Sequence, residues 1–419
     1  MVSDMKIISK EVIKPSSPTP IHLRNLKLSF LDQIAPPMYV PLIFFFNHHQ
    51  LTLQHFTHSK ISRLLKQSLS KTLTIFYPLG GRIQENSSVD CNDSGVEFIE
   101  ARVHTQLSEL IQEASMEEIK KLQPVESSLH DEEILLKVKI CFFDCGGISV
   151  AVSLSHKIAD GISSAAFVKA WSDSCRGESE TNILRPIFDL VSVFPQRDLS
   201  AFEKIEKLGM CEEKLVTKRF VFEKEEVTKM KNDFNTPRVV EAVSAYLWRR
   251  FMDVARAKNS SKTSFAAIHA VNLRPRRSPV AIPEQMFGNC FRRTIAFSEA
   301  EEEDDDHELV VKLRWAIARI DDDYIRKLEE GEHMDVLRGS VDLLKNGEVG
   351  LCSFSSWRRF PVYEVDFGWG KPVWVCTTTL PYKNLVVLMS TPCGEGIEAW
   401  ANMMEEDMKE FEQCLNECH

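Results

Sequence analysis

The stretch 148–176, ISVAVSLSHKIADGISSAAFVKAWSDSCR, constrains the fold more than any other part of the chain. Its first seven residues are mostly β-branched or apolar, which predicts a buried strand. Its second half carries apolar residues mostly at helical spacing, and Gly177 is typical of a position just after a helix. His156 and Asp160 are therefore expected at a strand-to-helix junction, where side chains can project from a rigid scaffold.

Neither side chain is by itself evidence of catalysis. A single histidine beside a core strand is more often a structural residue, and an aspartate just before a helix suits the N-cap position. A second distinctive stretch, SSWRRFPVYEVDFGWG at 355–370, ends in a Gly-Trp-Gly sequence that is typical of a close-packed turn.

The two stretches together carry a resemblance. HKIADG at 156–161 and DFGWG at 366–370 match the HxxxDG and DFGWG signatures, in that order, of the BAHD acyltransferases of plants. Further similar segments are SSPTP at 16–20, LDQ at 31–33, SLSKTLTIFYPLGGR at 68–82, VDCNDSGVEF at 89–98, AVNLRPR at 270–276 and FGN at 287–289. The resemblance covers essentially the whole chain. Within the family, segments such as SSVDCNDSGV, SHKIAD and CTTT are most similar to members that act on indole alkaloids.

Composition fits a globular protein and argues against several functions. With 419 residues, 43% hydrophobic and 27% charged, the chain has room for two or three domains. The net charge of −10 argues against a nucleic-acid partner, because no basic stripe is present to neutralise phosphates. The eleven cysteines are scattered without CxxC pairs or metal spacing, so neither a metal site nor a disulfide framework is predicted.

The N-terminal residues predict a cytoplasmic protein with no membrane partner. The start, MVSDMKIISKEVIK, lacks the apolar region of a signal peptide. The most apolar early run, 40–46, is interrupted by Pro41 and is too short to span a bilayer.

The order of the elements predicts an α/β protein. Strands and helices alternate in both halves of the chain. The pattern predicts single helices at 108–122, with Ser108 as N-cap, and at 306–329, and a short strand at 362–366. The resemblance adds the form: two similar domains of mixed sheet and helices with a chloramphenicol acetyltransferase-like fold, and an active-site channel between them.

Weak periodicity, prolines and many charges predict a linker at 186–213. It separates an N-terminal domain at 1–185, which carries HKIADG, from a C-terminal domain at 214–419, which carries DFGWG.

The resemblance implies an acyl-CoA-dependent O-acyltransferase that works as a monomer without a permanently bound cofactor. Its co-substrate would be acetyl-CoA and its acceptor an indole alkaloid hydroxyl. A poorly nucleophilic alcohol needs a base, and histidine suits this because its ordinary pKa of ~6.5 leaves it mostly neutral at neutral pH. The resemblance assigns His156 this role and gives Asp160 an orienting role through a salt bridge to Arg274. Asp366, of DFGWG, is either structural or a second proton acceptor.

The remaining candidates are weaker. Oxyanion donors could come from Asn289, Thr377 and Thr378, and the resemblance places Ser355, Ser356 and Trp357 along a CoA channel. Arg292 and Arg293 should point to opposite faces of a strand, where solvent and a surface ion pair would explain both. If one faced the donor channel, it could bind the carboxylate of malonyl-CoA, so malonyl transfer is an alternative. Another plant alcohol or amine as acceptor, and a non-catalytic metabolite-binding member of the fold, are further alternatives.

Overall fold

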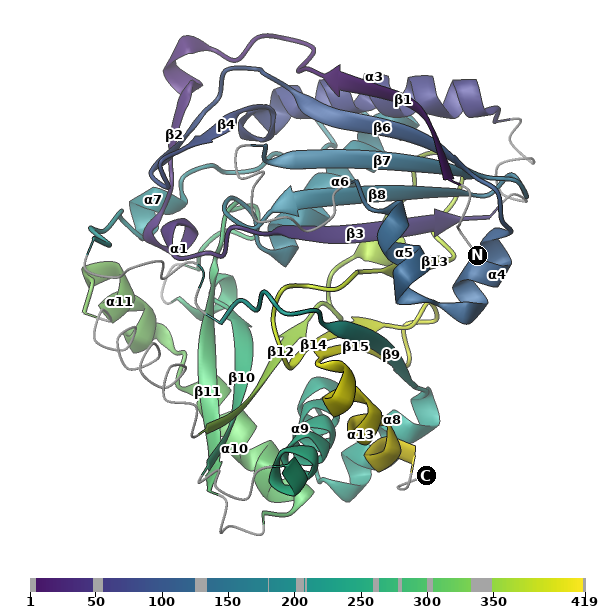
Figure 1. Ribbon diagram of the computed structural model, residues 1–419. Helices are drawn as coiled ribbons and strands as arrows, with labels where there is room; N and C mark the ends of the chain where they lie inside the picture. Colours follow the sequence, from purple (N-terminus) through teal and green to yellow (C-terminus); the bar gives the residue numbers. More distant parts are fainter. Residues whose placement is uncertain are drawn as a thin grey trace. The chain divides into compact units, whose positions relative to one another are not determined.

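The computed structural model has the α/β architecture that the sequence predicts, with strands and helices alternating along the chain (Figure 1). It describes residues 5–47, 56–124, 134–179, 181–200, 207, 209–258, 264–277, 281–299, 304–332 and 349–416. Across these ranges, every helix is too short or too polar to span a lipid bilayer.

The chain divides into two compact units. The first comprises Met1–Asp198, Gln285–Cys290 and Phe360–Thr378, and the second comprises Leu199–Glu284, Phe291–Arg359 and Thr379–His419. This differs from the contiguous division expected around the 186–213 segment, because two later segments, one of which carries DFGWG, belong to the first unit. Strand pairing explains part of the difference: β13 (Trp374–Cys376) is hydrogen-bonded to β3 (Tyr39–Phe46).

A six-stranded mixed sheet forms the centre of the first unit. Its strands, in spatial order, are β1 (Met5–Ile13), β6 (Val96–Val103), β7 (Leu136–Phe143), β8 (Ile148–Ser155), β3 and β13. Only β6 and β7 are parallel within this sheet. Because Tyr39 lies opposite Ser155 in the pairing of β3 with β8, the next residue, His156, lies beside the segment before β3. The backbone N–H of His156 donates to the carbonyl of Met38 at 2.7 Å.

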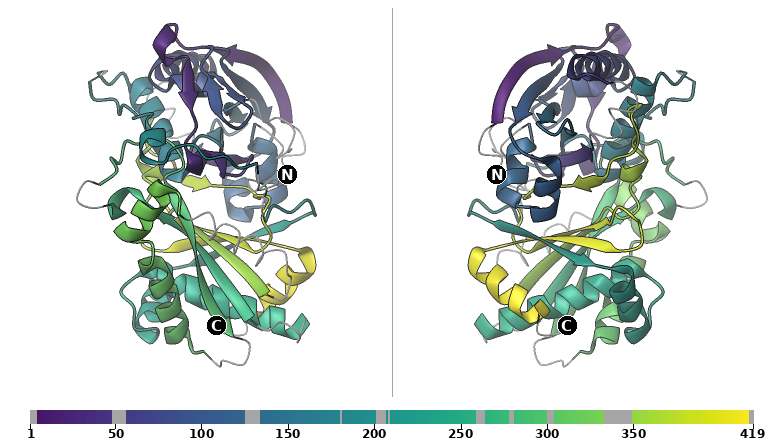
Figure 2. Two further views of the ribbon diagram at one scale, coloured as in Figure 1. Left: turned by 90° about the vertical axis from the view of Figure 1, so that its left-hand side faces the viewer. Right: turned by 90° about the vertical axis from the view of Figure 1, so that its right-hand side faces the viewer.

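Helices cover both faces of this sheet. The helices α3 (His58–Ile75) and α6 (Gly161–Arg176) pack together on one face, and α4 (Leu107–Glu113) and α5 (Met116–Leu122) lie on the other (Figures 1 and 2). All residues of β7 and β8 are buried, as expected for strands covered on both sides. The shorter elements of this unit are β2 (Asn25–Lys27), α1 (Phe30–Gln33), β4 (Arg82–Gln84), β5 (Ser88–Asp90), α7 (Leu190–Val193) and 3₁₀ turns at Ile21–Leu23, Tyr77–Gly80 and Val362–Glu364.

The second unit has its own six-stranded mixed sheet. Its strands, in spatial order, are β11 (Phe291–Glu299), β10 (Ser264–Asn272), β12 (Val349–Ser356), β14 (Leu385–Ser390), β15 (Ile397–Met403) and β9 (Val216–Phe222). Its helices are α8 (Lys224–Asp233), α9 (Val239–Lys258), α10 (Asp306–Ala318), α11 (Asp322–Glu330) and α13 (Glu405–Asn416), with a 3₁₀ turn at Arg274–Arg276.

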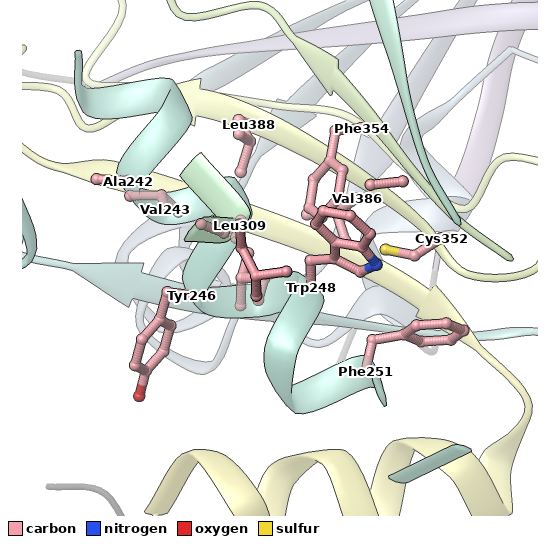
Figure 3. Packing of buried hydrophobic residues seen from close by; sticks show 14 of the residues in the cluster. Ala242, Val243, Tyr246, Trp248, Phe251, Leu309, Cys352, Phe354, Val386 and Leu388 are labelled. Carbon is pink, nitrogen blue, oxygen red and sulfur yellow. The ribbon is translucent and has the colours of Figure 1, made fainter. Parts of the chain in front are cut away.

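The core of the second unit lies between its sheet and α9. Trp248 of α9 is fully buried, and it lies with Leu309 of α10 against Phe354 of β12 and Leu388 of β14 (Figure 3). Burying such large apolar side chains stabilises a fold by roughly 1.5–3 kcal/mol each. This core holds β10 and β12, the strands that precede two candidate site residues, Arg274 and Trp357.

Three predicted elements are wrong. The predicted helix at 108–122 is two helices, α4 and α5, because Ala114 adopts a left-handed conformation with φ of 46°, and Gln106 rather than Ser108 is the N-cap. The predicted helix at 306–329 is also two helices, α10 and α11. The second begins after Asp321, whose carboxylate accepts from the backbone N–H of Tyr324. The predicted strand at 362–366 is a 3₁₀ turn, which follows Pro361.

A buried histidine in β10 makes the stability of the second unit depend on pH. The ring of His269 stacks on that of Phe354 with centroids 5.0 Å apart, and its Nε2 has no hydrogen-bond partner in the described part of the chain. Burial lowers the pKa of His269 from 6.5 to about 4, because the charged ring would lose its hydration.

We expect the free energy of unfolding to fall as the pH is lowered from about 6.5 to about 4. In this window the unfolded chain protonates His269 whereas the folded chain does not, so the unfolded state binds more protons. His269 contributes about 3 kcal/mol to the pH-dependent part of the unfolding free energy. This contribution is fully present above about pH 6.5 and is lost below about pH 4. Urea denaturation at several pH values measures it. His269→Phe should flatten the profile, whereas the same change at exposed His307 should not; equal profiles for all three proteins would contradict the prediction.

Candidate active site

The structure confirms the strand-to-helix junction predicted around HKIADG. β8 ends at Ser155 and α6 begins at Gly161, so His156 and Asp160 lie in the short connection between them. His156 is partly exposed, whereas Asp160 is buried. A partly exposed imidazole on a rigid connection can reach a substrate, so this residue has the exposure that a proton acceptor needs.

Asn289, of the FGN motif, determines which nitrogen of His156 carries the proton. Its Nδ2 donates to the backbone carbonyl of His156 at 2.7 Å, and its Oδ1 lies 2.9 Å from Nδ1 of the same histidine. The backbone carbonyl can only accept, so Nδ2 must face it and Oδ1 must face the ring. Nδ1 of a neutral His156 is therefore the protonated nitrogen, and Nε2 carries the basic lone pair.

The same contacts favour a positioning role for Asn289 over the oxyanion role considered from the sequence. Both hydrogens of Nδ2 are already donated, one to His156 O and one to Oδ1 of Asp32 at 2.9 Å. Asn289 is fully buried, so its amide cannot turn toward a substrate without breaking these bonds. The sequence alone indicates no role for Asp32, although the LDQ segment that contains it is among the resembling segments.

Asp160 binds two backbone groups within the first unit. Its Oδ1 accepts from the N–H of Ser163 at 2.8 Å, which is the predicted N-cap contact of α6. Its Oδ2 accepts from the N–H of Cys290 at 3.1 Å. Asp160 therefore also ties the FGN segment to the histidine connection, a link between residues 130 positions apart that local pattern cannot predict.

Two glycines allow this close packing. Gly288 has a φ of 139°, and a Cβ there would lie 2.7 Å from Cδ2 of Leu190. A Cβ on Gly161, the glycine of HKIADG, would lie 2.2 Å from Cε2 of Phe360. The glycine in each motif is thus required by backbone conformation or by a neighbouring side chain.

The DFGWG segment is a turn closed by its aspartate. Oδ1 of Asp366 accepts from the N–H groups of Gly368 at 2.8 Å and Gly370 at 2.9 Å, and both glycines have positive φ. The ring of Trp369 is fully buried and packs edge-on against Phe46 of β3, with centroids 5.9 Å apart. These contacts give the segment a structural task in the first unit.

Comparisons with known proteins agree on one family. The model of the Transferase family matches residues 3–417. Stemmadenine O-acetyltransferase of Catharanthus roseus is 43% identical over an alignment that covers 97% of this chain and 96% of that protein. Vinorine synthase of Rauvolfia serpentina is 42% identical over 97% of this chain and 96% of its own length. The chain belongs to the BAHD acyltransferases.

Solved structures agree with the fold of the acyltransferase. The crystal structure of vinorine synthase matches with a TM-score of 0.86 and 40% identity, over 97% of this chain and 96% of that one. TRI101 of F. sporotrichioides, solved with coenzyme A and T-2, matches with a TM-score of 0.74 over 93% of this chain and 97% of that one. At 18% identity this second likeness concerns the fold alone. The family resemblance and the fold class expected from the sequence are confirmed.

The two threonine candidates for oxyanion donors are both engaged within the first unit. The hydroxyl of Thr377 donates to the carbonyl of Pro41 at 3.0 Å, and that of Thr378 donates to Oε1 of Gln123 at 2.8 Å. Both residues are buried. The bond of Thr377 attaches the residue after β13 to β3, and that of Thr378 attaches the next residue to the end of α5.

The other candidates lie in the second unit. Ser355 and Ser356 end β12, and the indole N–H of Trp357 donates to Oγ of Ser355 at 3.0 Å. Arg274 is buried, and its Nη1 donates to Oδ1 of Asn272 at 3.3 Å.

The two adjacent arginines of β11 contact tyrosines rather than carboxylates in the described part of the chain. Nε of Arg292 donates to the hydroxyl of Tyr324 at 3.3 Å, and the guanidinium of Arg293 lies over the ring of Tyr382. No group of His, Cys, Asp and Glu residues that could hold a metal ion occurs among the described residues.

Asp366→Asn should distinguish the structural from the chemical role of this aspartate. Asn keeps an oxygen that can accept from Gly368 and Gly370, so we expect thermal stability and turnover close to wild type. Asp366→Ala leaves both N–H groups without their acceptor and should lower the free energy of unfolding by about 1–3 kcal/mol. Calorimetry and steady-state assays on both variants measure this. If Asp366 were instead a second proton acceptor, the Asn and Ala variants would lose activity equally.

Proposed function

We propose that the protein transfers an acetyl group from acetyl-CoA to a hydroxyl of an indole alkaloid, with His156 as general base. The observation that carries the proposal is the contact with Asn289, which makes Nε2 the basic nitrogen of a partly exposed histidine. Family membership supports the acyl-CoA donor. The names of two relatives that are similar over nearly the whole chain, a stemmadenine O-acetyltransferase and a vinorine synthase, support an alkaloid acceptor.

The chemistry needs one proton acceptor and no permanently bound cofactor. Nε2 of His156 takes the hydroxyl proton as the acceptor oxygen bonds to the thioester carbonyl carbon. The tetrahedral intermediate then collapses, the carbon–sulfur bond breaks, and the imidazolium gives its proton to the sulfur of CoA. The Oδ1 atom of Asn289 stabilises the transient imidazolium, because it accepts from the Nδ1–H throughout.

The test is a direct assay. Purified protein is incubated with acetyl-CoA and a panel of indole alkaloid alcohols, and the acetylated product and free CoA are followed by liquid chromatography with mass spectrometry. Thiol reagents are unsuitable, because the chain has eleven cysteines of its own. Stoichiometric formation of ester and CoA with at least one alcohol is expected. Absence of turnover with every donor and acceptor, by a protein that binds them, would indicate a non-catalytic member of the fold.

Acetyl transfer is preferred over malonyl transfer. The alternative rests on Arg292 and Arg293, and both guanidinium groups have aromatic partners within the second unit. An arginine can still bind a carboxylate while it packs on a ring, so the two donors should be compared directly. A malonyl-CoA rate that exceeds the acetyl-CoA rate, and that falls when either arginine becomes Ala, would reverse the assignment. An amine acceptor is tested in the same panel, as an amide product.

We further infer that the enzyme is a cytoplasmic monomer. The eleven scattered cysteines, which show no CxxC pairs, support the location, since thiols stay reduced in the cytosol. Light scattering of the purified protein and imaging of a fluorescent fusion check the two points.

The salt bridge between Asp160 and Arg274 that the family resemblance implies is likewise a proposal. Arg274 is 1% exposed, so a variant that neutralises its partner should lose about 3–5 kcal/mol of unfolding free energy. Asp160→Asn and Arg274→Ala should each lose stability and activity, and the double variant much less than their sum. Strict additivity in a thermal-denaturation cycle would reject the pair. The role of Asp160 would then rest on its bonds to Ser163 and Cys290.

A further inference from the structure

The LDQ segment, which the proposed reaction does not use, lies next to the histidine site. Asp32 belongs to α1 and is 5% exposed. Four hydrogen-bond donors converge on its carboxylate. Oδ2 accepts from the N–H of Ser29 at 3.0 Å and from its Oγ at 2.6 Å, and Oδ1 accepts from the N–H and Nδ2 of Asn289 at 2.8 and 2.9 Å.

A helix cap explains only half of these contacts. Ser29 and Asp32 form a capping box, which uses Oδ2 and the serine side chain. Oδ1 is directed away from this cap, to an asparagine 257 positions later in the chain. Helix capping therefore gives no reason for the contact with Asn289.

The contacts form one chain from the carboxylate to the ring. Asp32 Oδ1 accepts from Asn289 Nδ2, and Asn289 Oδ1 accepts from Nδ1 of His156. An amide whose N–H is bound by an anion has more negative charge on its oxygen, so it becomes a stronger acceptor. A more strongly held Nδ1–H raises the proton affinity of Nε2, as the carboxylate does in a Ser-His-Asp triad.

We propose that Asp32 is a positioning residue for the transfer reaction: its buried carboxylate acts through Asn289 to orient His156 and to raise the basicity of Nε2. The proposal rests on the proposed function, in which His156 is the base.

Burial raises the pKa of Asp32 above its ordinary 3.8, and the hydrogen bonds from Ser29 and Asn289 oppose this rise because they favour the carboxylate. The two N–H groups of Asn289 that face Oδ1 donate and cannot accept a proton. Two charged side chains of the histidine connection bind other groups. Nζ of Lys157 donates to the carbonyls of Gln33 and Ala35, and Asp160 accepts from Cys290 N–H.

The first experiment compares two substitutions in the full-length protein. Asp32→Asn has the same shape and can still accept from Asn289, but it removes the charge and replaces the Oδ2 acceptor of the capping box with an NH2 group. We expect kcat to fall about 10- to 100-fold, the effect of a lost charge-assisted hydrogen bond, with KM for both substrates unchanged. The acid limb of the pH profile of kcat should move to lower pH by about one unit. Ser29→Ala, the control, breaks the capping box on Oδ2, so it should lower the melting temperature without moving the limb.

A second measurement does not depend on turnover. The imidazole of His156 is titrated by NMR in wild type and in Asp32→Asn, with its signal assigned by its loss in His156→Ala. A lower pKa of His156 in Asp32→Asn supports the chain of contacts even if no acceptor has been found, and so separates this proposal from the identity of the substrate.

Equal pKa values of His156 in the two proteins, with a lower melting temperature for Asp32→Asn, would show that Asp32 only caps α1 and would overturn the proposal. If His156→Ala keeps its turnover, the base assignment itself fails, whatever the titration shows. In the Asn289→Ala background, Asp32→Asn should have no further effect on the pKa, because the connecting amide is gone; an undiminished shift there would also overturn the proposal.

Discussion

Replacing His156 with alanine is expected to lower turnover by about 10²–10⁴-fold and to leave the fold intact. That range is the usual effect of removing a general base, and the partly exposed ring contributes little to the buried core. Asn289 keeps its bonds to Asp32 and to the backbone carbonyl of residue 156, so the FGN segment should stay in place. Single-turnover kinetics with acetyl-CoA and a good acceptor measure the chemical step directly.

Circular dichroism and a melting curve serve as the controls for folding, and His104→Ala serves as a matched variant. His104 is a half-exposed histidine of the first unit, where its Nδ1 lies 3.1 Å from a carboxylate oxygen of Asp144. It should keep wild-type turnover. A folded His156→Ala protein with more than about a third of the wild-type chemical rate would rule out the assignment of this residue as the base.

Trp369→Ala is expected to have the largest effect on stability, a loss of about 3–5 kcal/mol of unfolding free energy. Its indole is fully buried and contacts the rings of Phe46, Phe56 and Phe367. Removing it leaves a cavity between the DFGWG turn and β3, which the surrounding aromatic rings can fill only in part. Urea denaturation followed by circular dichroism measures the loss.

Trp315 offers a matched control because it is 70% exposed on α10. Trp315→Ala should change the unfolding free energy by less than about 0.5 kcal/mol, as for other surface positions. Equal stability losses at the two tryptophans would contradict the view that DFGWG packs as a structural turn.

Local pattern was sufficient for much of the fold. The β-branched run before His156 and the apolar spacing after Gly161 predicted β8 and α6 correctly, because both elements depend on neighbours in sequence. The helices predicted at 108–122 and 306–329 failed because one residue decides each break. Ala114 ends α4 in a left-handed conformation, which an alanine in the sequence does not predict. Asp321 caps a new helix within a pattern that otherwise predicts one continuous helix.

The candidate site could be predicted only in part. The resemblance placed His156 and Asp160 in it, but the partners that give these residues their geometry lie more than a hundred positions away. Asn289 is a candidate oxyanion donor from the sequence, whereas its burial and its two donated hydrogens are visible only in the structure. The sequence indicates no role for Asp32, because its contact with Asn289 joins residues 257 positions apart.

The pairing of β3 with β13 has a consequence for how the cell makes this protein. β3 carries the apolar sequence YVPLIFFF, and one of its two neighbours in the sheet comes from residues 374–376. On the ribosome, that edge therefore has no native neighbour until nearly nine-tenths of the chain has been translated. An uncovered apolar edge strand is a site for pairing with other chains, so nascent chains need protection over this interval. A truncated messenger RNA that ends before the codons for residues 374–376 would yield a fragment that aggregates rather than a folded first unit.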